Sequence, residues 1–431
     1  MLALPGVVPA ADRAGGGLTK LQTLRGRALD GAHGVAVSPD GKNVYVTAAG
    51  PGGGVAVFAR DGSGKLSQLS GSAGCVTESG SGGKCTKARG VKGASSLAVS
   101  ANGKSVYVVS FNLAILSRNP KTGALTPLAG AQGCLGSAAG CGKARGVVAG
   151  NVGSVTVSPD GKSVYVGSHR VSTNANHEQR DDGAVAVFAR SANGALKQLS
   201  GTKGCVSNGG FDGCESASLL GTIGSLAVSP DGKNVYVGSE TNSEDFPAPS
   251  AVLTFTRAGD GSLAAAGCVA RTKRQGCSVY EAIFTPTSMA VSADGKNVYV
   301  TALQTHSVTF LSRGSGGELK PINCIGFSFA RCKENHNLFG PTSVALSADG
   351  KNAYVTWEGG PSAVSAFDRK ADGVLAFLPG KEACVGERPL SGTCAVGKGL
   401  EGAVAVAASP DGKNVYVAAT RVSTVTAFAR S

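Results

Sequence analysis

The sequence predicts an all-β fold, namely a seven-bladed β-propeller of four-stranded antiparallel blades, and three observations support it. A motif of the form Ser-(Pro/Ala)-(Asp/Asn)-Gly-Lys recurs seven times, at intervals of 55 to 71 residues. Each copy lies between short segments in which apolar and small residues alternate. The last copy lacks a fourth strand, and the N-terminus supplies one. Units of this size bury both faces only when they pack around a ring.

The turn motif separates the first and second strands of each blade. Its seven copies begin at Ser38, Ser100, Ser158, Ser229, Ser292, Ser347 and Ser409. The Asp-Gly or Asn-Gly pair predicts a tight hairpin, because these residues tolerate positive φ. A Val-Tyr-Val triplet follows in six copies, and residues 353–355 read Ala-Tyr-Val instead. We therefore expect a strand on either side of every turn.

The third strand of each copy ends in an arginine, as at residues 55–60. These arginines are Arg60, Arg118, Arg190, Arg257, Arg313, Arg369 and Arg430. A glycine-containing turn then leads to a fourth strand, predicted at residues 64–69 in the first copy. Because Tyr, Phe and Arg recur in every blade, we interpret them as structural, and we expect the Asp of each turn to make local hydrogen bonds.

The two ends of the chain complete one blade. Residues 16–21 match residues 64–69 in the spacing of glycine and leucine, so we predict that they form the outer strand of the last blade. Residues 16–431 are then a single propeller domain, and residues 1–15 are a flexible segment or the remnant of a signal peptide. No apolar run approaches the ~18 residues of a membrane helix.

The twelve cysteines form six close pairs, 7 to 10 positions apart. The pairs are Cys75 with Cys85, Cys134 with Cys141, Cys205 with Cys214, Cys268 with Cys277, Cys324 with Cys332, and Cys384 with Cys394. A zinc site would need four ligands gathered together, usually at closer spacing. We predict instead one local disulfide in each of six inter-blade loops, with no metal and no cofactor. Disulfides persist in oxidising compartments, so we expect a secreted, extracellular or cell-surface protein.

The net charge of +13 allows a nucleic-acid partner, but the distribution of charge argues against one. Lysine and arginine recur at fixed turn positions, and the chain has no run of five basic residues.

The repeated Ser-Pro-Asp-Gly-Lys-x-Val-Tyr-Val resembles the YVTN-type repeat of the seven-bladed lactonase-like propeller family. Residues 45–47, 299–301 and 354–356 carry the first three letters of that name, and Ala48, Ala302 and Trp357 replace the fourth. The resemblance implies the propeller fold. The family includes phosphogluconolactonases and carboxymuconate cyclases, but its repeats also occur in surface proteins without known chemistry. No stretch matches the family's catalytic motif residue by residue.

Candidate catalytic residues are those that depart from the repeat at the end of a second strand. They are His169 and Arg170 in blade 3, Glu240 in blade 4 and Arg421 in blade 7. Opening a lactone needs a base that activates water and a cation that stabilises the oxyanion. His169 or Glu240 fits the first role, and Arg170 or Arg421 fits the second.

Candidate binding residues are His33, Trp357, Glu358, Arg89 and Arg145. His33 starts a first strand near the expected channel, where other blades have small residues. The arginines belong to a Lys-Ala-Arg-Gly-Val sequence that occurs twice, and a shared loop conformation explains it as well as an anion site does.

Two functions follow from these features. The first is a non-catalytic extracellular scaffold that binds a small molecule, a glycan or a protein, or that self-associates, and that six disulfides stiffen. The alternative is a lactonase-like enzyme that opens or closes a lactone ring at the channel mouth. The sequence leaves open which of the two applies.

Overall fold

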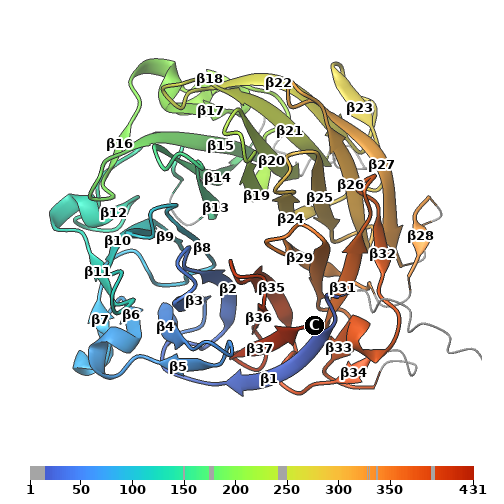
Figure 1. The fold of residues 1–431 in the computed structure, drawn as a ribbon. Coiled ribbons are helices and arrows are strands. Elements are labelled where there is room, and N and C mark those ends of the chain that lie inside the picture. The colour runs from blue at the N-terminus through green and yellow to red at the C-terminus, as the bar shows by residue number, and fades with distance from the viewer. Residues whose placement is uncertain are drawn as a thin grey trace, which may run out of the picture.

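Seven antiparallel β-sheets surround a central axis in the computed structural model (Figure 1). The structure describes residues 15–148, 151–173, 179–240, 250–327, 329, 331–335, 338–389 and 394–431. The predicted all-β fold and its seven blades are confirmed. No helix among these residues is both long and apolar enough to cross a membrane.

The strands of the first three blades have the following bounds. Blade 1 holds β2 (Ala32–Val37), β3 (Asn43–Ala48), β4 (Val55–Arg60), β5 (Leu66–Gln68), β6 (Cys75–Thr77) and β7 (Thr86–Lys87). Blade 2 holds β8 (Ser96–Val99), β9 (Ser105–Val109), β10 (Leu113–Arg118), β11 (Leu125–Pro127) and β12 (Cys134–Leu135). Blade 3 holds β13 (Val152–Val157), β14 (Ser163–Thr173), β15 (Gln179–Arg190), β16 (Leu196–Gln198), β17 (Cys205–Ser207) and β18 (Glu215–Ser216).

The remaining blades follow the same order. Blade 4 holds β19 (Thr222–Val228), β20 (Asn234–Glu240), β21 (Ser250–Arg257), β22 (Leu263–Ala270) and β23 (Cys277–Val279). Blade 5 holds β24 (Pro286–Val291), β25 (Asn297–Ala302), β26 (Ser307–Arg313), β27 (Leu319–Gly326) and β28 (Lys333–Glu334). Blade 6 holds β29 (Pro341–Leu346), β30 (Asn352–Trp357), β31 (Ala363–Arg369), β32 (Leu375–Phe377), β33 (Cys384–Gly386) and β34 (Ala395–Val396). Blade 7 holds β35 (Ala403–Ala408), β36 (Asn414–Ala419), β37 (Thr424–Arg430) and β1 (Leu18–Leu24). Short 3₁₀ turns are η1 (Gly71–Gly74), η2 (Ser81–Gly83), η3 (Gly130–Gly133), η4 (Gly201–Gly204), η5 (Asn208–Gly213) and η6 (Lys381–Ala383).

The ring closes where the two ends of the chain meet. Strand β1 pairs antiparallel with β37, in a register that runs from Leu18 opposite Arg430 to Leu24 opposite Val425. In Figure 1 the blue β1 lies along the outside of the red β37. The predicted closure by an N-terminal strand is confirmed.

All six predicted disulfides are formed, and no cysteine of the described residues is free. The bridges join Cys75 to Cys85, Cys134 to Cys141, Cys205 to Cys214, Cys268 to Cys277, Cys324 to Cys332, and Cys384 to Cys394. The local pairing that the sequence predicted is therefore confirmed for every pair.

The position of the bridges differs in detail from the prediction of loop disulfides, because the first cysteine of each pair lies in the outer strand of its blade. A short further strand runs parallel to that outer strand in five of the blades, and in blade 4 Cys268 lies directly opposite Cys277, the first residue of β23. The bridges therefore fasten the outer edge of each blade to the start of the connection to the next. The other second cysteines lie in these connections, as predicted, and they are Cys85, Cys141, Cys214, Cys332 and Cys394.

The core lies between neighbouring blades. The Val-Tyr-Val strands are buried throughout, and their side chains pack into clusters that join two blades, such as Tyr45 with Val106 and Val108. Alternation along each strand sends successive side chains to opposite neighbours, so each blade contributes to two clusters.

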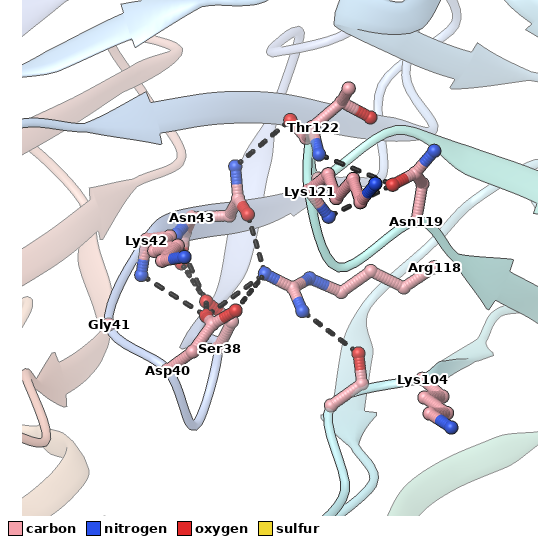
Figure 2. Close-up of polar contacts among 12 residues, drawn as sticks. Ser38, Asp40, Gly41, Lys42, Asn43, Lys104, Arg118, Asn119, Lys121 and Thr122 are labelled. Carbon is pink, nitrogen blue, oxygen red and sulfur yellow. Dashed lines mark hydrogen bonds and ion pairs between the residues drawn. The ribbon is translucent and has the colours of Figure 1, made fainter.

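At the end of the blades where the repeated turns lie, a network of hydrogen bonds and an ion pair joins blades 1 and 2 (Figure 2). We call this network a polar junction. Arg118 of blade 2 donates from Nη2 to Asp40 and Asn43 of blade 1, as Figure 2 shows. Its Nε donates to the Tyr45 hydroxyl at 2.6 Å. The Tyr45 hydroxyl donates in turn to the carbonyl of Gly123 at 2.9 Å. Burial raises the pKa of Tyr45 to about 12, although Arg118 opposes the shift, so the phenol keeps its proton.

Equivalent junctions close all seven interfaces. Six of them pair the arginine with a turn aspartate at 2.7 to 2.9 Å, and these pairs are Arg60–Asp411, Arg118–Asp40, Arg257–Asp160, Arg313–Asp231, Arg369–Asp294 and Arg430–Asp349. The seventh uses Asn102, whose Oδ1 accepts from Arg190 at 3.1 Å. The repeated Asp therefore bonds locally, as expected, and also joins adjacent blades.

Candidate functional site

A cavity of about 720 Å³ occupies the centre of the ring. Its wall begins with one residue near the start of each first strand, and these are His33, Ser95, Gly153, Gly224, Thr287, Thr342 and Val404. Apart from His33 these residues are small, and three of them carry hydroxyl groups, so the wall is mildly polar. The volume is in the range of pockets that hold small organic ligands.

Hydrogen bonds between blades hold part of this wall in place. The Thr342 hydroxyl donates to the Ala403 carbonyl at 3.0 Å, and the Nδ1 atom of His33 lies 2.9 Å from the Ser95 carbonyl. A carbonyl oxygen only accepts, so Nδ1 carries the proton of the neutral imidazole. The lone pair of His33 is then on Nε2, the atom that points away from this bond.

Glu240, at the end of β20, lines the cavity on the side of blade 4. Its Oε1 accepts a hydrogen bond from the Thr285 hydroxyl at 2.9 Å. Thr222 lies opposite Glu240 in the sheet and also lines the cavity. One carboxylate oxygen is thus positioned by the connection to the next blade, and the other has no hydrogen-bond partner among the described residues.

Glu358 and Arg421 line the cavity from blades 6 and 7. Within the described residues, neither side chain makes a hydrogen bond or ion pair. Gly402 makes room for Arg421, because a Cβ atom at this position would lie 2.8 Å from the arginine Cγ. The adjacent Thr420 donates to the Ala32 carbonyl at 2.9 Å and so fixes the loop against blade 1.

His169 has the same place in blade 3 that Glu240 has in blade 4, yet it is not among the residues that line the cavity. Burial lowers its pKa, with the Asp181 carboxylate opposing the shift, and its Nδ1 atom is buried without a hydrogen-bond partner among the described residues. Asp181 accepts from the Thr222 hydroxyl at 2.6 Å. Blade 3 has a longer hairpin, β14–β15, and His169 lies within it opposite Gly183.

Arg170, predicted as an electrophilic partner, also lies away from the cavity. Its guanidinium carbon is 4.0 Å from the centre of the Phe211 ring, and its Nε is 3.6 Å from Asp182. The predicted pair of His169 and Arg170 is therefore not brought to the same cavity as Glu240.

The remaining predicted binding residues do not line the central cavity, and their side chains contact other parts of the fold. Trp357 is 1% exposed, and its indole donates to the Ser365 hydroxyl at 3.1 Å. Arg145 donates to the carbonyls of Leu199, Gly201 and Gly213 in blade 3.

Arg89 makes one similar contact, from Nη1 to the Ala139 carbonyl at 3.4 Å. These contacts match a shared loop conformation, the alternative that the sequence left open for the repeated basic segment.

Sequence reasoning missed Thr222, Thr285 and Leu303 as cavity residues. Leu303 gave a usable signal, because it stands four residues after the repeated tyrosine, as Glu240 and Glu358 do. The threonines gave none, since they lie near connections of variable length.

Comparison with solved structures returns other propellers. A Bacteroides uniformis protein provisionally assigned as a 6-phosphogluconolactonase matches with a TM-score of 0.54 and 18% identity, over 95% of this chain and 92% of its own. A periplasmic gluconolactonase from Pseudomonas aeruginosa matches with a TM-score of 0.55 and 18% identity, over 90% and 92%. A chain of the mitotic checkpoint complex matches with a TM-score of 0.54 and 15% identity, over 99% and 96%.

No family model matches the chain, and no curated protein matches it. At identities this low the structural likeness concerns the fold alone. Six disulfides fit a protein that folds outside the cytoplasm. The chain is a disulfide-bonded seven-bladed β-propeller, and the solved structures share this fold with it.

Proposed function

We propose that the protein hydrolyses a small lactone in its central cavity. The observation that carries the proposal is the convergence of His33, Glu240, Glu358 and Arg421 on one cavity. Together these residues provide a lone pair, two carboxylates and a cation. The solved structures described as lactonases have the same fold, which makes this reaction class a natural one to test.

The chemistry follows from the state of each group. Water adds to the lactone carbonyl while His33 Nε2 takes its proton. The ring C–O bond then breaks, and Nε2 returns the proton to the leaving ring oxygen, which gives a hydroxy acid and restores the neutral imidazole. Arg421 stabilises the negative charge that develops on the carbonyl oxygen, because no described residue already neutralises it. Glu358 comes from blade 6, two blades after Glu240 and one before Arg421. Both carboxylates accept hydrogen bonds from hydroxyl groups of the substrate.

The arrangement also predicts a preference for a compact ligand. Three of the four residues, His33, Glu358 and Arg421, come from the consecutive blades 6, 7 and 1. They therefore act on one side of the cavity, while Glu240 reaches it from blade 4. A five- or six-membered ring with several hydroxyl groups is suited to such a polar wall.

The test is hydrolysis of sugar lactones and aliphatic lactones by the oxidised full chain, followed as acid release at constant pH. We expect turnover well above the uncatalysed rate, with His33→Gln and Arg421→Gln each reducing kcat/KM by about 10²-fold or more. Arg331→Gln is the matched control, because Arg331 is 67% exposed and lies outside the cavity. Folded protein without turnover on any lactone would refute the proposal.

The second candidate is the non-catalytic scaffold, attached to or exported from the cell. The six outer-edge disulfides favour it, since they stiffen a rim that the proposed reaction does not use. Absence of turnover together with a well-folded chain would favour this function, and self-association would then be measured by light scattering.

A further inference from the structure

A ring of seven exposed lysines lies on the face opposite the cavity residues. Its members are Lys42, Lys104, Lys162, Lys233, Lys296, Lys351 and Lys413, one from each repeated turn. In the part of the chain that the structure describes, none of their ammonium groups makes a hydrogen bond or ion pair. Figure 2 shows this for Lys104, whose side chain extends away from the neighbouring contacts. We call this set the lysine ring.

Strand geometry separates the lysine ring from the cavity. The first strand of blade 1 begins beside His33, in the cavity wall, and its last residue, Val37, leads directly into the turn that holds Lys42. Six extended residues span about 20 Å. The first strands are the innermost strands of the blades (Figure 1), so the ring surrounds the axis of the propeller at that face.

The aspartates of the same turns do not neutralise these lysines. Each already binds the arginine of the next blade, as Asp294 binds Arg369 at 2.8 Å. Burial alone would raise the pKa of Asp294, but hydrogen bonds from Ser292 and Arg369 hold it at about 2. Aspartate and arginine thus cancel each other's charge at the interface. The lysine ring keeps its charge.

Blade 2 adds to the positive charge of this face. Its turn has Asn102 where six blades have aspartate, so Arg190 has a neutral partner. The outer turns of the same face carry both signs: Asp61 is held by its own Ser63 hydroxyl, and Asp260 pairs with Lys203 at 3.0 Å. Around the axis, by contrast, every blade contributes one exposed lysine without an ion pair among the described residues.

We propose that the lysine ring binds an extended anionic polysaccharide that carries carboxylate or phosphate groups. A ligand with regularly repeated charges matches a receptor in which one cation is repeated seven times. The large exposed hydrophobic residues, such as Phe111 and Phe339, lie in other loops, so these turns offer no side chains for membrane insertion. They also present no aromatic residue on which nucleic-acid bases would stack. The proposal is independent of lactone hydrolysis, because it concerns the other face.

The test uses hyaluronan, a linear carboxylate polysaccharide, coupled to a sensor surface, with dextran as the neutral surface. The ring variant changes Lys42, Lys162, Lys296 and Lys413 to Gln. The control variant makes the same change at four exposed lysines outside the ring, which are Lys84, Lys87, Lys92 and Lys273. Both variants lose four positive charges.

We expect the wild type and the control variant to bind hyaluronan with similar affinity and the ring variant to bind at least tenfold more weakly. Binding should weaken steeply as NaCl rises from 50 to 200 mM, because the polymer releases bound counterions. Equal loss in both variants would overturn the proposal, since it would reflect net charge alone. So would tighter binding to duplex DNA, or to vesicles with 30% phosphatidylglycerol, than to hyaluronan. Unchanged unfolding midpoints establish that the variants are folded.

Discussion

Arg118→Met tests the junction between blades 1 and 2. Arg118 has a 1% exposed side chain, and methionine fills much of its volume without a donor. The substitution leaves the Tyr45 hydroxyl and the Asn43 amide oxygen, in residues that are 0 and 3% exposed, without the donor they now share. Each buried acceptor without a partner costs about 1–3 kcal/mol. Asp40 adds about 1 kcal/mol or less, because its side chain is 32% exposed and keeps its bonds to Ser38 and Lys42.

We therefore expect Arg118→Met to lower the free energy of unfolding by about 3–5 kcal/mol. The measurement is the urea midpoint, followed by the fluorescence of Trp357, the single tryptophan, and by circular dichroism in parallel. Coincident transitions are needed for the two-state comparison. Asp40→Asn is the control, and should cost only about 1 kcal/mol because blade 2 already has Asn102 at the same position. A loss below about 1 kcal/mol for Arg118→Met, or equal losses for both variants, would refute the reasoning.

Three further predictions concern the junctions and the disulfides. Asn102→Asp gives Arg190 a charged partner and should raise stability at pH 7 by about 0.5–1 kcal/mol, and a chemical denaturation midpoint at or below the wild-type value would contradict this. The turn aspartates of four junctions have a pKa of about 2 in the folded protein, compared with 3.8 in an unfolded chain. Burial raises this pKa, but hydrogen bonds from serine and arginine lower it by more. Their stabilisation is thus complete above about pH 4 and is lost as the pH falls toward 2, so a stability that stays constant from pH 5 to 2 would disagree. Of the six bridges, Cys268–Cys277 alone has neither cysteine buried, so a mild reductant should reduce it first. Alkylation followed by mass spectrometry identifies the first bridge to open, and another bridge opening earlier would contradict the prediction.

The fold could be predicted from the sequence because its determinants are local and repeated. Each turn motif fixes a hairpin, and each Val-Tyr-Val triplet fixes a strand that is buried on both faces. Strand closure also followed from a match between residues 16–21 and 64–69, since any strand with that pattern fits the outer edge of a blade. The split of the outer strand into β5 and β6 around η1 was not predictable, because short glycine-rich segments carry no clear periodicity.

The disulfide pairing was predictable for the same reason, and its exact place in the blade was not. Cys75 and Cys85 are near neighbours in the sequence, which was enough to pair them. Cys75 nevertheless belongs to β6, which the sequence pattern did not reveal, so the bridge was assigned wholly to a loop. Cys85 does lie in that loop, one residue before β7.

The candidate site was predictable only in part. Glu240, Arg421, Glu358 and His33 were found because they depart from a repeated pattern, and all four line the cavity. His169 departs in the same way but lies in a lengthened hairpin, where Asp181 and burial determine its surroundings. A one-dimensional pattern identifies a position within a blade. It does not report how a neighbouring loop changes the environment of that position.

The residues on one face of the ring differ from blade to blade, whereas those on the other face repeat, and this difference affects what each face can bind. The position four residues after the repeated tyrosine holds Ala49, Phe111, His169, Glu240, Leu303, Glu358 and Thr420. This face therefore presents each chemical group once or twice and suits a small asymmetric molecule held in one orientation. The lysine of the turn is the same in all seven blades, although the seven inter-blade junctions do not use its ammonium group. Identical groups spaced around a ring give no single small ligand a preferred orientation, whereas a polymer of repeated charges gains from every copy. A propeller with a catalytic cavity at one end and a polymer-binding ring at the other would keep its reaction close to an anionic surface outside the cell.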